Sequence, residues 1–308
     1  MPVSAGDKIL VGTGIRTQSM QRLGYAQPAA VGMDETVLAR IDEIAAEAIR
    51  DEGTPGCQIL IARKGKVVWN KGYGYHTYDS LLPVHTETVY DIASITKVAA
   101  TLQVAMFLSG QGLLDLRRKA SYYLPELIGT NKEDVQLTEM LTHQAGLIPF
   151  IPHFARVTAD SLLYDSLLRP EPEELYQVQI APAIYTSEAM QDSLWKWTLE
   201  SGMRSKPDTA RQYTYKYSDI AFYILHRICE KLLNQPIEDF LAQNFYQPLG
   251  LNALTFLPLC RYPIDQIVPT EDDTYFRNGR VHGLVHDPGA AMYGGVAGHA
   301  GIFSNAYD

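Results

Sequence analysis

The sequence predicts an α+β fold, and three observations lead to that class. An amphipathic helix is followed at once by two strands joined by a turn at Lys64 and Gly65. A strongly apolar helix then begins at Ser94, and beyond Phe107 the pattern is mostly helical. At 308 residues the chain is long enough for one large domain or for two intertwined lobes.

The first elements follow from local signals. Residues 1–32 are rich in Gly, Ser, Gln and Pro and are interpreted as an arm or linker. Asp34 is a candidate N-cap for a helix that ends near Gly53. The hairpin strands are predicted at residues 58–62 and 66–73. The apolar face expected for the helix consists of Val37, Leu38, Ile41, Ile44, Ala45, Ala48 and Ile49.

The stretch YDIASITK, residues 90–97, places Ser94 and Lys97 three positions apart, on one helix face. Ser94 would lie at the N-terminal end of the helix, where free N–H groups favour developing negative charge. Lys97 opposes the helix dipole there, and burial would disfavour its charged form, so a role as proton acceptor is expected. The alternative is that Ser94 caps the helix and Lys97 reaches solvent. A second Ser-x-x-Lys match, Ser193 to Lys196, shows how readily this motif occurs.

The helix after Ser94 is apolar almost all round, which predicts burial. A further helix is expected from Thr138 to near Gly146. Residues 148–208 combine helix-like segments with repeated prolines. We interpret them as a helical insertion, and one role considered for it is a lid. Three tyrosines then alternate as in an extended segment: Tyr213, Tyr215 and Tyr217.

Two more helices are predicted in the second half of the chain. Ser218 and Asp219 are candidate N-caps for a helix over residues 220–233, and a short helix follows Pro236. The glycine-rich stretch after Val281 predicts tight turns or close backbone approach.

Composition excludes some partners. A formal net charge of −9 argues against nonspecific nucleic-acid binding, and no basic run predicts a membrane-surface patch. The expected partner is a small molecule or a peptide. No segment is expected to be long enough to span a membrane, and residues 1–20 have no export-signal pattern.

Metal and disulfide sites are not predicted, and no cofactor is expected. Cys57, Cys229 and Cys260 are widely spaced, so each is interpreted as a small core residue. His282, His286 and Asp287 could be drawn as metal ligands, but they do not share a helical face, and a loop-stabilising role is favoured.

Taken together, YDIASITK and Tyr217-Ser218-Asp219 resemble the serine β-lactamase and penicillin-binding-protein superfamily, most of all the group with class C β-lactamases, D-alanyl-D-alanine carboxypeptidases and esterases. Four further stretches are similar to this group: LTEMLTHQAGL, YSDIAFYIL, FYQPLGL and GGVAGHAGIFS. The resemblance covers residues 33–308. It implies a two-lobe fold in which a helical lobe is inserted in an α/β lobe, with the active site at their junction.

The resemblance also implies roles for individual residues. Ser94 would be the acylated nucleophile, Lys97 its base or proton shuttle, and Tyr217 would activate Ser94 or the deacylating water. Which of Lys97 and Tyr217 takes the proton stays open. Ser94 opens the apolar helix, whereas Ser193 lies within the insertion, so Ser94 is the preferred nucleophile.

Two departures from the family pattern concern substrate binding. Asp219 stands where an Asn is common, which replaces a donor by an acceptor. An aspartate at this position would fit a substrate that carries an amine. The alternative is a structural role in which Asp219 only caps its helix and pairs with a lysine. The family's third element, Lys or His then Thr or Ser then Gly, has no clear copy. His299-Ala300-Gly301 has its outline, but a structural role is favoured for His299 and Gly301.

The expected function is a serine acyl-enzyme hydrolase acting on an amide or ester, with a D-amino-acid peptide or small ester ahead of a β-lactam. The alternative is a non-catalytic accessory domain that binds cell-wall peptide, with a further domain fused upstream. The resemblance implies the periplasm or cell envelope. We also expect an incomplete domain, because the predicted hairpin has no later strands to complete its sheet.

Overall fold

The computed structural model describes residues 22–187, 189–206 and 212–308. Most of the expected arm lies outside these residues. The mixed lobe holds a three-stranded sheet in the order β1-β3-β2. Strands β2, Gly56–Arg63, and β3, Lys66–Gly74, form the predicted antiparallel hairpin, and β1, Gly24–Tyr25, runs parallel to β3. The hairpin prediction is therefore confirmed.

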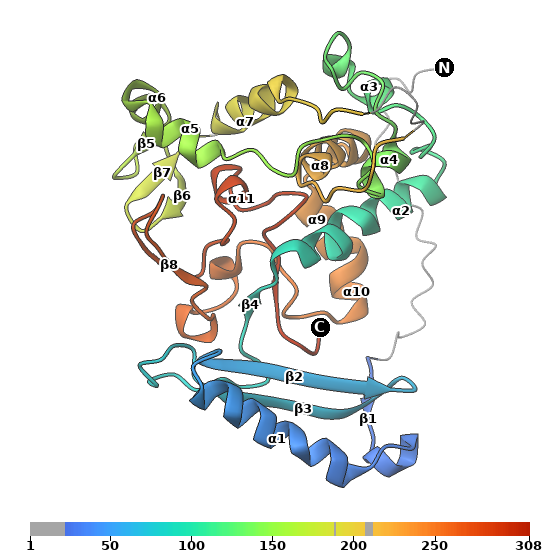
Figure 1. Ribbon diagram of the computed structural model, residues 1–308, viewed down its shortest axis with the longest axis vertical. Helices are drawn as coiled ribbons and strands as arrows, with labels where there is room; N and C mark the ends of the chain where they lie inside the picture. Colours follow the sequence, from blue (N-terminus) through green and yellow to red (C-terminus); the bar gives the residue numbers. More distant parts are fainter. Residues whose placement is uncertain (1–21, 188, 207–211) are drawn as a thin grey trace.

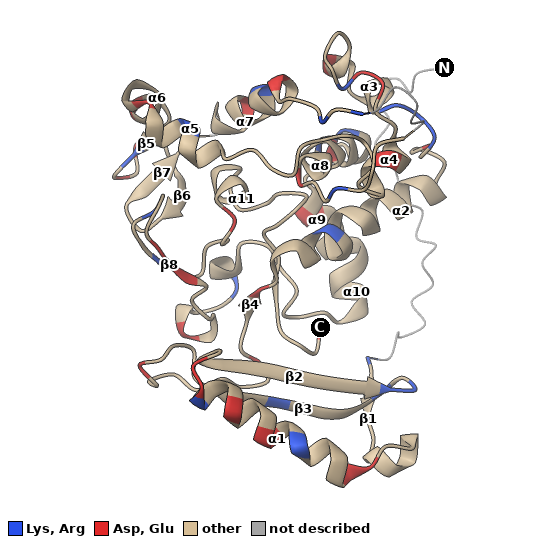
Figure 2. Ribbon diagram, viewed as in Figure 1, with Lys and Arg blue, Asp and Glu red and all other residues tan. Residues whose placement is uncertain are grey.

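Helix α1, Glu35–Arg50, lies along the face of the hairpin that points away from the helical lobe (Figure 1). Asp34 caps it as predicted, because its carboxylate accepts hydrogen bonds from two backbone N–H groups of the first turn. The predicted apolar face is too wide: Leu38 and Ala45 are buried, whereas Val37 and Ile44 are 61% and 59% exposed. Acidic and basic residues are spread along α1 (Figure 2).

The described end of the expected arm is folded onto this lobe, which corrects that expectation for residues 22–32. It contains β1 and a 3₁₀ turn, Pro28–Val31, in which Val31 is buried. The two-residue strand gave no alternating pattern in the sequence that could have predicted it.

A short antiparallel pair joins the tail of the chain to the segment before Ser94. Strand β4, Tyr90–Asp91, pairs with β10, Phe303–Ser304. The chain then enters a 3₁₀ turn, Ala93–Ile95, a π-helical turn, Lys97–Thr101, and helix α2, Leu102–Gly110. This pairing brings the glycine-rich tail beside Ser94.

The Ser94-bearing helix is buried on one side only, contrary to the expectation that it is buried all round. Ala100, Val104 and Leu108 are fully buried on the side that packs against α8, but Val98 and Met106 are 52% and 60% exposed. Its length and mean hydropathy of 1.2 meet the minimum for crossing a membrane, contrary to the expectation from sequence. The same test is passed by core helices of globular proteins, and this helix carries a buried lysine, so the finding alone carries little weight.

The helical lobe is centred on α8, Ile220–Leu233, whose residues are mostly buried. This helix and the short helix after Pro236 confirm the predictions. Cys229 lies in this core as predicted, whereas Cys260 is exposed, so its assignment to the core is wrong. The other helices of this lobe are α3, Ala120–Tyr123; α4, Leu137–Leu141; α9, Ile237–Leu241; and α10, Gln247–Leu249.

The insertion contains strands that sequence analysis did not predict. Its helices are α5, His153–Ala159; α6, Ser161–Leu167; and α7, Ala189–Glu200. Between them lies a small antiparallel sheet in the order β5-β7-β6, formed by Leu168–Arg169, Ile184–Thr186 and Val178–Ala181. Strands of two to four residues are too short to produce a periodic pattern. The tyrosine strip forms no strand over residues 212–217.

The tail folds back between the lobes. A hairpin of β8, Glu271–Asp273, and β9, Gly279–Val281, precedes helix α11, Pro288–Met292. The predicted tight turns are present, since Gly294, Gly295 and Gly301 all have positive φ angles.

Candidate active site

Ser94 is presented by a strained turn. The preceding Ala93 has φ of +45°, a conformation that non-glycine residues rarely adopt. The carboxylate of Asp91 holds the turn by accepting the Ala93 N–H at 2.7 Å. Burial raises the pKa of Asp91, although this N–H and that of His286 oppose the shift. The side chain of Ser94 is exposed at the start of the helix.

Lys97 is buried beneath Ser94, and its side chain is only 4% exposed. Its Nζ lies 2.8 Å from Ser94 Oγ, 3.2 Å from the carbonyl oxygen of His299 and 2.7 Å from Asp219 Oδ1. The structure thus brings the predicted serine and lysine together. The alternative in which Lys97 reaches solvent is wrong.

Tyr217 and Asp219 reach the same point from the segment before α8. The ring of Tyr217 lies beside the Lys97 ammonium group, 4.8 Å from Nζ to the centroid, and is 40% exposed. Asp219 occupies the N-cap position of α8, but its carboxylate caps no N–H group there and instead pairs with Lys97. Of the two roles weighed for a structural Asp219, pairing is observed and side-chain capping is not.

His143 holds this segment in place and was given no role by sequence analysis. Its Nδ1 accepts the backbone N–H of Ser218 at 3.1 Å, and its ring lies against that of Tyr217 with centroids 4.6 Å apart. Burial, with a smaller contribution from Lys97, lowers the pKa of His143 and favours the neutral ring that this hydrogen bond requires. Its place in LTEMLTHQAGL was the available signal, because that stretch carried part of the resemblance.

His299 acts through its backbone, since its side chain is only 3% exposed. The carbonyl oxygen accepts from Lys97, while ring Nε2 lies 2.9 Å from Asp287 Oδ1. Burial alone would raise the pKa of Asp287, but His299 and the Ala290 N–H hold that pKa well below its usual range. A Cβ on Gly301 would come within 2.3 Å of the Gly295 carbonyl oxygen. The His299 ring is therefore buried against Asp287, and Gly301 allows the close approach of two backbone segments, as the structural role favoured for both residues requires.

The second Ser-x-x-Lys match does not form a comparable pair. Ser193 lies on α7 and donates to the carbonyl oxygen of Ala189 in its own helix, 3.3 Å away. Lys196 is exposed and lies 4.0 Å from Glu200. This geometry supports the choice of Ser94.

The three side chains considered as metal ligands contact three different partners. His282 Nε2 lies 2.7 Å from the carbonyl oxygen of Ile267, and His286 Nε2 lies 3.1 Å from Glu271. Asp287 binds His299. Within the described ranges no group of three or more His, Cys, Asp or Glu side chains could hold a metal ion. These contacts are those of residues that stabilise a loop.

The sequence profile of the Beta-lactamase family matches residues 41–308. The chain belongs to the Beta-lactamase family. A protein of Salmonella gallinarum named "Putative D-alanyl-D-alanine carboxypeptidase" is 30% identical to this family member over 93% of the chain. The alignment spans 65% of that relative's length, so the chain accounts for somewhat less than two thirds of it.

Solved structures show that this Beta-lactamase family member has the two-lobe fold that the resemblance implied. A penicillin-binding-protein homologue from Pyrococcus abyssi matches with a TM-score of 0.61 at 22% identity, covering 87% of this chain and 53% of that one. A β-lactamase/D-alanine carboxypeptidase from Pseudomonas syringae matches with a TM-score of 0.58 at 19% identity, covering 89% and 63%. At these identities the matches show the fold alone.

Proposed function

We propose that the protein is a serine hydrolase that forms an acyl-enzyme through Ser94 and acts on an amide or an ester. The observation that carries the proposal is the 2.8 Å contact between the exposed hydroxyl of Ser94 and the buried amine of Lys97. A weak nucleophile needs a base within hydrogen-bond reach, and here the base is itself held by Asp219 and the His299 carbonyl group.

The reaction proceeds in two steps. Ser94 Oγ forms a bond to the substrate carbonyl carbon as its proton passes to Lys97 Nζ, with the side-chain oxygen of Tyr217 as the alternative acceptor. The carbonyl electron pair moves to oxygen, for which the backbone N–H of Ser94 is our candidate donor. Collapse of the tetrahedral intermediate expels an alcohol or amine, which takes up the proton. Water then hydrolyses the ester on Ser94, and the same groups return the proton.

The proposed substrate class is supported by the family and by a named relative. The match to the Beta-lactamase family and the 30% identical relative named "Putative D-alanyl-D-alanine carboxypeptidase" support a substrate with an amide, ester or lactam carbonyl. We place D-amino-acid peptides and small esters ahead of β-lactams, because Asp219 offers no N–H group to a substrate carbonyl. Such peptides would locate the protein at the cell envelope, which cell fractionation would test.

A fluorophosphonate probe tests the acyl-enzyme, with the adduct located by peptide mass mapping. We expect the adduct on Ser94, loss of labelling and of p-nitrophenyl ester hydrolysis in Ser94→Ala, and little change in Ser193→Ala. The Ser193→Ala control removes the hydroxyl of the competing motif. Equal loss in both variants would overturn the assignment. Absence of any adduct on the folded protein would favour the accessory peptide-binding domain.

A further inference from the structure

The carboxylate of Asp219 has one oxygen in use and one available. Oδ1 lies 2.7 Å from Lys97 Nζ and is shielded from solvent, whereas the side chain as a whole is 23% exposed. The exposed part of the carboxylate therefore includes Oδ2. This side chain caps no N–H group of α8, so Oδ2 is not committed to the helix. Beside Ser94 the protein thus presents a hydrogen-bond acceptor with negative charge.

Asp219 lies close enough to the reacting bond to contact the substrate. Lys97 Nζ is the shared neighbour of Ser94 Oγ and Asp219 Oδ1, so only two short contacts separate the nucleophile from the carboxylate. Ser94 Oγ must approach the substrate carbonyl carbon, and a substituent on the adjacent α-carbon is two bonds further on. The ring of Tyr217, which is 40% exposed, lies beside the same lysine.

We propose that the preferred substrates are amino-acid amides or esters whose α-amino group is free and protonated. This rests on the proposed acyl-enzyme function of Ser94. The substrate ammonium group would donate to Asp219 Oδ2, and hydrogen bonds between ionised partners are the strong ones. An N-acylated substrate keeps only one uncharged N–H group at that nitrogen, so its contact with the carboxylate lacks the attraction between opposite charges.

The Lys97–Asp219 pair adds a second reason for this preference. Asp219 is shared between its buried lysine and whatever enters from solvent. A substrate cation at Oδ2 competes with Lys97 for the carboxylate, and this leaves the amine freer to interact with Ser94. A neutral N-acyl group provides no such competition. The net charge of −9 on the chain further favours the approach of a cation.

Two matched substrates test the preference: alanine p-nitroanilide and N-acetylalanine p-nitroanilide, each as the D and the L enantiomer. We expect kcat/KM for the free amine to exceed that for the acetylated compound by about 10-fold or more, the size of one hydrogen bond to a charged group. The ratio should fall toward one in Asp219→Asn. Because the ratio is taken within each variant, a general change in Ser94 reactivity cancels.

The control is Asp272→Asn on β8, which removes the same charge from an exposed ion pair with Arg280 on β9. The ratio should stay at its wild-type value there. A second measurement needs no turnover: alaninamide and N-acetylalaninamide are compared for their ability to protect Ser94 from labelling by the fluorophosphonate. Equal protection, or equal ratios in wild type and Asp219→Asn, would overturn the preference while leaving the acyl-enzyme intact. Failure of Ser94 to label at all would instead overturn the proposed function on which it rests.

Discussion

At the residue scale, three oxygen atoms from distant parts of the chain surround Lys97 Nζ. Lys97 Nζ donates to Ser94 Oγ at 2.8 Å and to the His299 carbonyl oxygen at 3.2 Å, and Asp219 Oδ1 lies 2.7 Å away as its ion-pair partner. These contacts hold the amine beside the Ser94 hydroxyl, within the reach that proton transfer between them requires.

Tyr217→Phe separates the hydroxyl of Tyr217 from its ring. The ring beside Lys97 and the contact with His143 would remain, so folding should not change. We expect the acylation rate to fall about 10²-fold, as for a lost acid–base group. Stopped-flow acylation by a p-nitrophenyl ester, with thermal unfolding as the control for folding, measures it. A near-normal rate would show that Tyr217 only packs against Lys97.

Sequence analysis predicted the side chains that share a short motif but not those that meet across the fold. Ser94 and Lys97 follow from helical spacing, and Tyr217 and Asp219 follow from the resemblance. The His299 carbonyl oxygen could not be found, because it is a backbone atom 202 positions from Lys97. Asp91 has no recognisable pattern either, since its role depends on the turn at Ala93 and on the loop at His286.

At the scale of elements, two half-buried carboxylates, those of Asp91 and Asp287, connect the tail to the turn that holds Ser94. Asp91, on β4, accepts the N–H groups of Ala93 and of His286, each at 2.7 Å. The next residue, Asp287, holds the ring of His299, whose carbonyl oxygen accepts from Lys97. The contacts close a ring that contains both reactive side chains. Each carboxylate is therefore a candidate positioning residue for the Ser94–Lys97 pair.

Asp287→Asn removes the charge opposite the His299 ring and keeps an oxygen for the Ala290 N–H. We expect the acylation rate to fall about 10-fold with little change in KM, because the lysine is displaced slightly while the substrate surface stays intact. Steady-state and single-turnover kinetics with a p-nitrophenyl ester give the two quantities.

The matched control is Glu230→Gln, in a similar pair on α8. Glu230 lies 3.1 Å from the buried His226 ring and accepts the N–H of Ile237, but this pair does not contact Lys97. It should lower stability without lowering the acylation rate of the folded protein. Equal kinetic effects in the two variants would contradict a positioning role for Asp287.

Lys132 joins α7 to the rest of the helical lobe through a fully buried ammonium group. Its Nζ donates to Asn131 Oδ1 and to the carbonyl oxygens of Leu199 and Ser201, at 2.9, 3.1 and 2.6 Å. Two of these acceptors belong to the C-terminal end of α7, where the helix dipole favours a cation. Burial nevertheless lowers the pKa of Lys132 to about 8, from an ordinary 10.5.

The unfolding free energy measured over a series of pH values should reveal the effect of burying Lys132. Between about pH 8 and 10.5 the unfolded chain binds more protons at Lys132 than the folded chain, so this residue makes stability rise with pH. We expect the difference in unfolding free energy between wild type and Lys132→Met to shift in favour of wild type by on the order of 2 kcal/mol across that range. Urea unfolding of both proteins at each pH measures it. A difference that does not change with pH would show that Lys132 titrates as it does in the unfolded chain.

The elements themselves were predictable where the pattern was long. The hairpin strands and α8 are eight or more residues long in the structure, which confirms both elements. The sheet of the insertion was missed, because its strands have two to four residues and owe their pairing to the packing of α5, α6 and α7 around them. The exposed side of α2 was missed for a different reason: hydrophobicity shows that a face is apolar but not whether a neighbour covers it.

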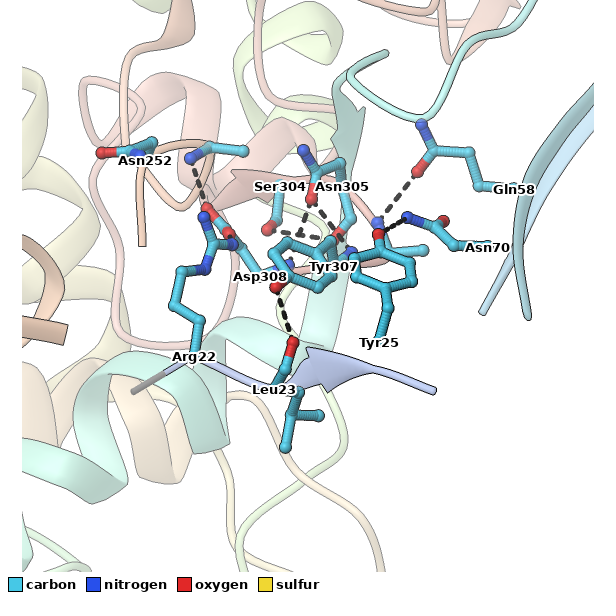
Figure 3. A network of polar contacts seen from close by, with 12 residues as sticks. Arg22, Leu23, Tyr25, Gln58, Asn70, Asn252, Ser304, Asn305, Tyr307 and Asp308 are labelled. Carbon is cyan, nitrogen blue, oxygen red and sulfur yellow. Dashed lines mark hydrogen bonds and ion pairs between the residues drawn. The ribbon is translucent and has the colours of Figure 1, made fainter. Parts of the chain in front are cut away.

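At the scale of the whole molecule, the residues that follow β10 connect both lobes with the first described residues (Figure 3). The Asp308 carboxylate is 2% exposed and binds the Arg22 guanidinium group and the Ala253 N–H. The backbone of Ala306 donates to Gln58 on β2 at 2.8 Å. This segment therefore contacts the sheet, the chain before β1 and the helical lobe within four residues.

Tyr307 provides the aromatic part of this junction. Its hydroxyl donates to the carbonyl oxygen of Leu23 at 2.8 Å, its ring stacks on Tyr25 with centroids 5.9 Å apart, and Arg22 lies over its face at 4.1 Å. The parallel pairing of β1 with β3 covers only two residues, so it has few hydrogen bonds of its own to hold it. The contacts of Tyr307 should thus supply much of the stability of β1 at the sheet.

Tyr307→Ala removes the ring and the hydroxyl together and should release residues 22–26 from the sheet. We expect faster amide hydrogen exchange there, including at Ala26, whose N–H donates to Val67, and an unfolding free energy lower by about 1–2 kcal/mol. Tyr275→Ala is the control, because the ring of Tyr275 makes an edge-to-face contact with Phe154 in the other lobe. Exchange at residues 22–26 should be unaffected by that change. If Ala26 in Tyr307→Ala were protected from hydrogen exchange as well as in wild type, the β1–β3 pairing would be stable without Tyr307. The segment after β10 would then contact the sheet without stabilising it.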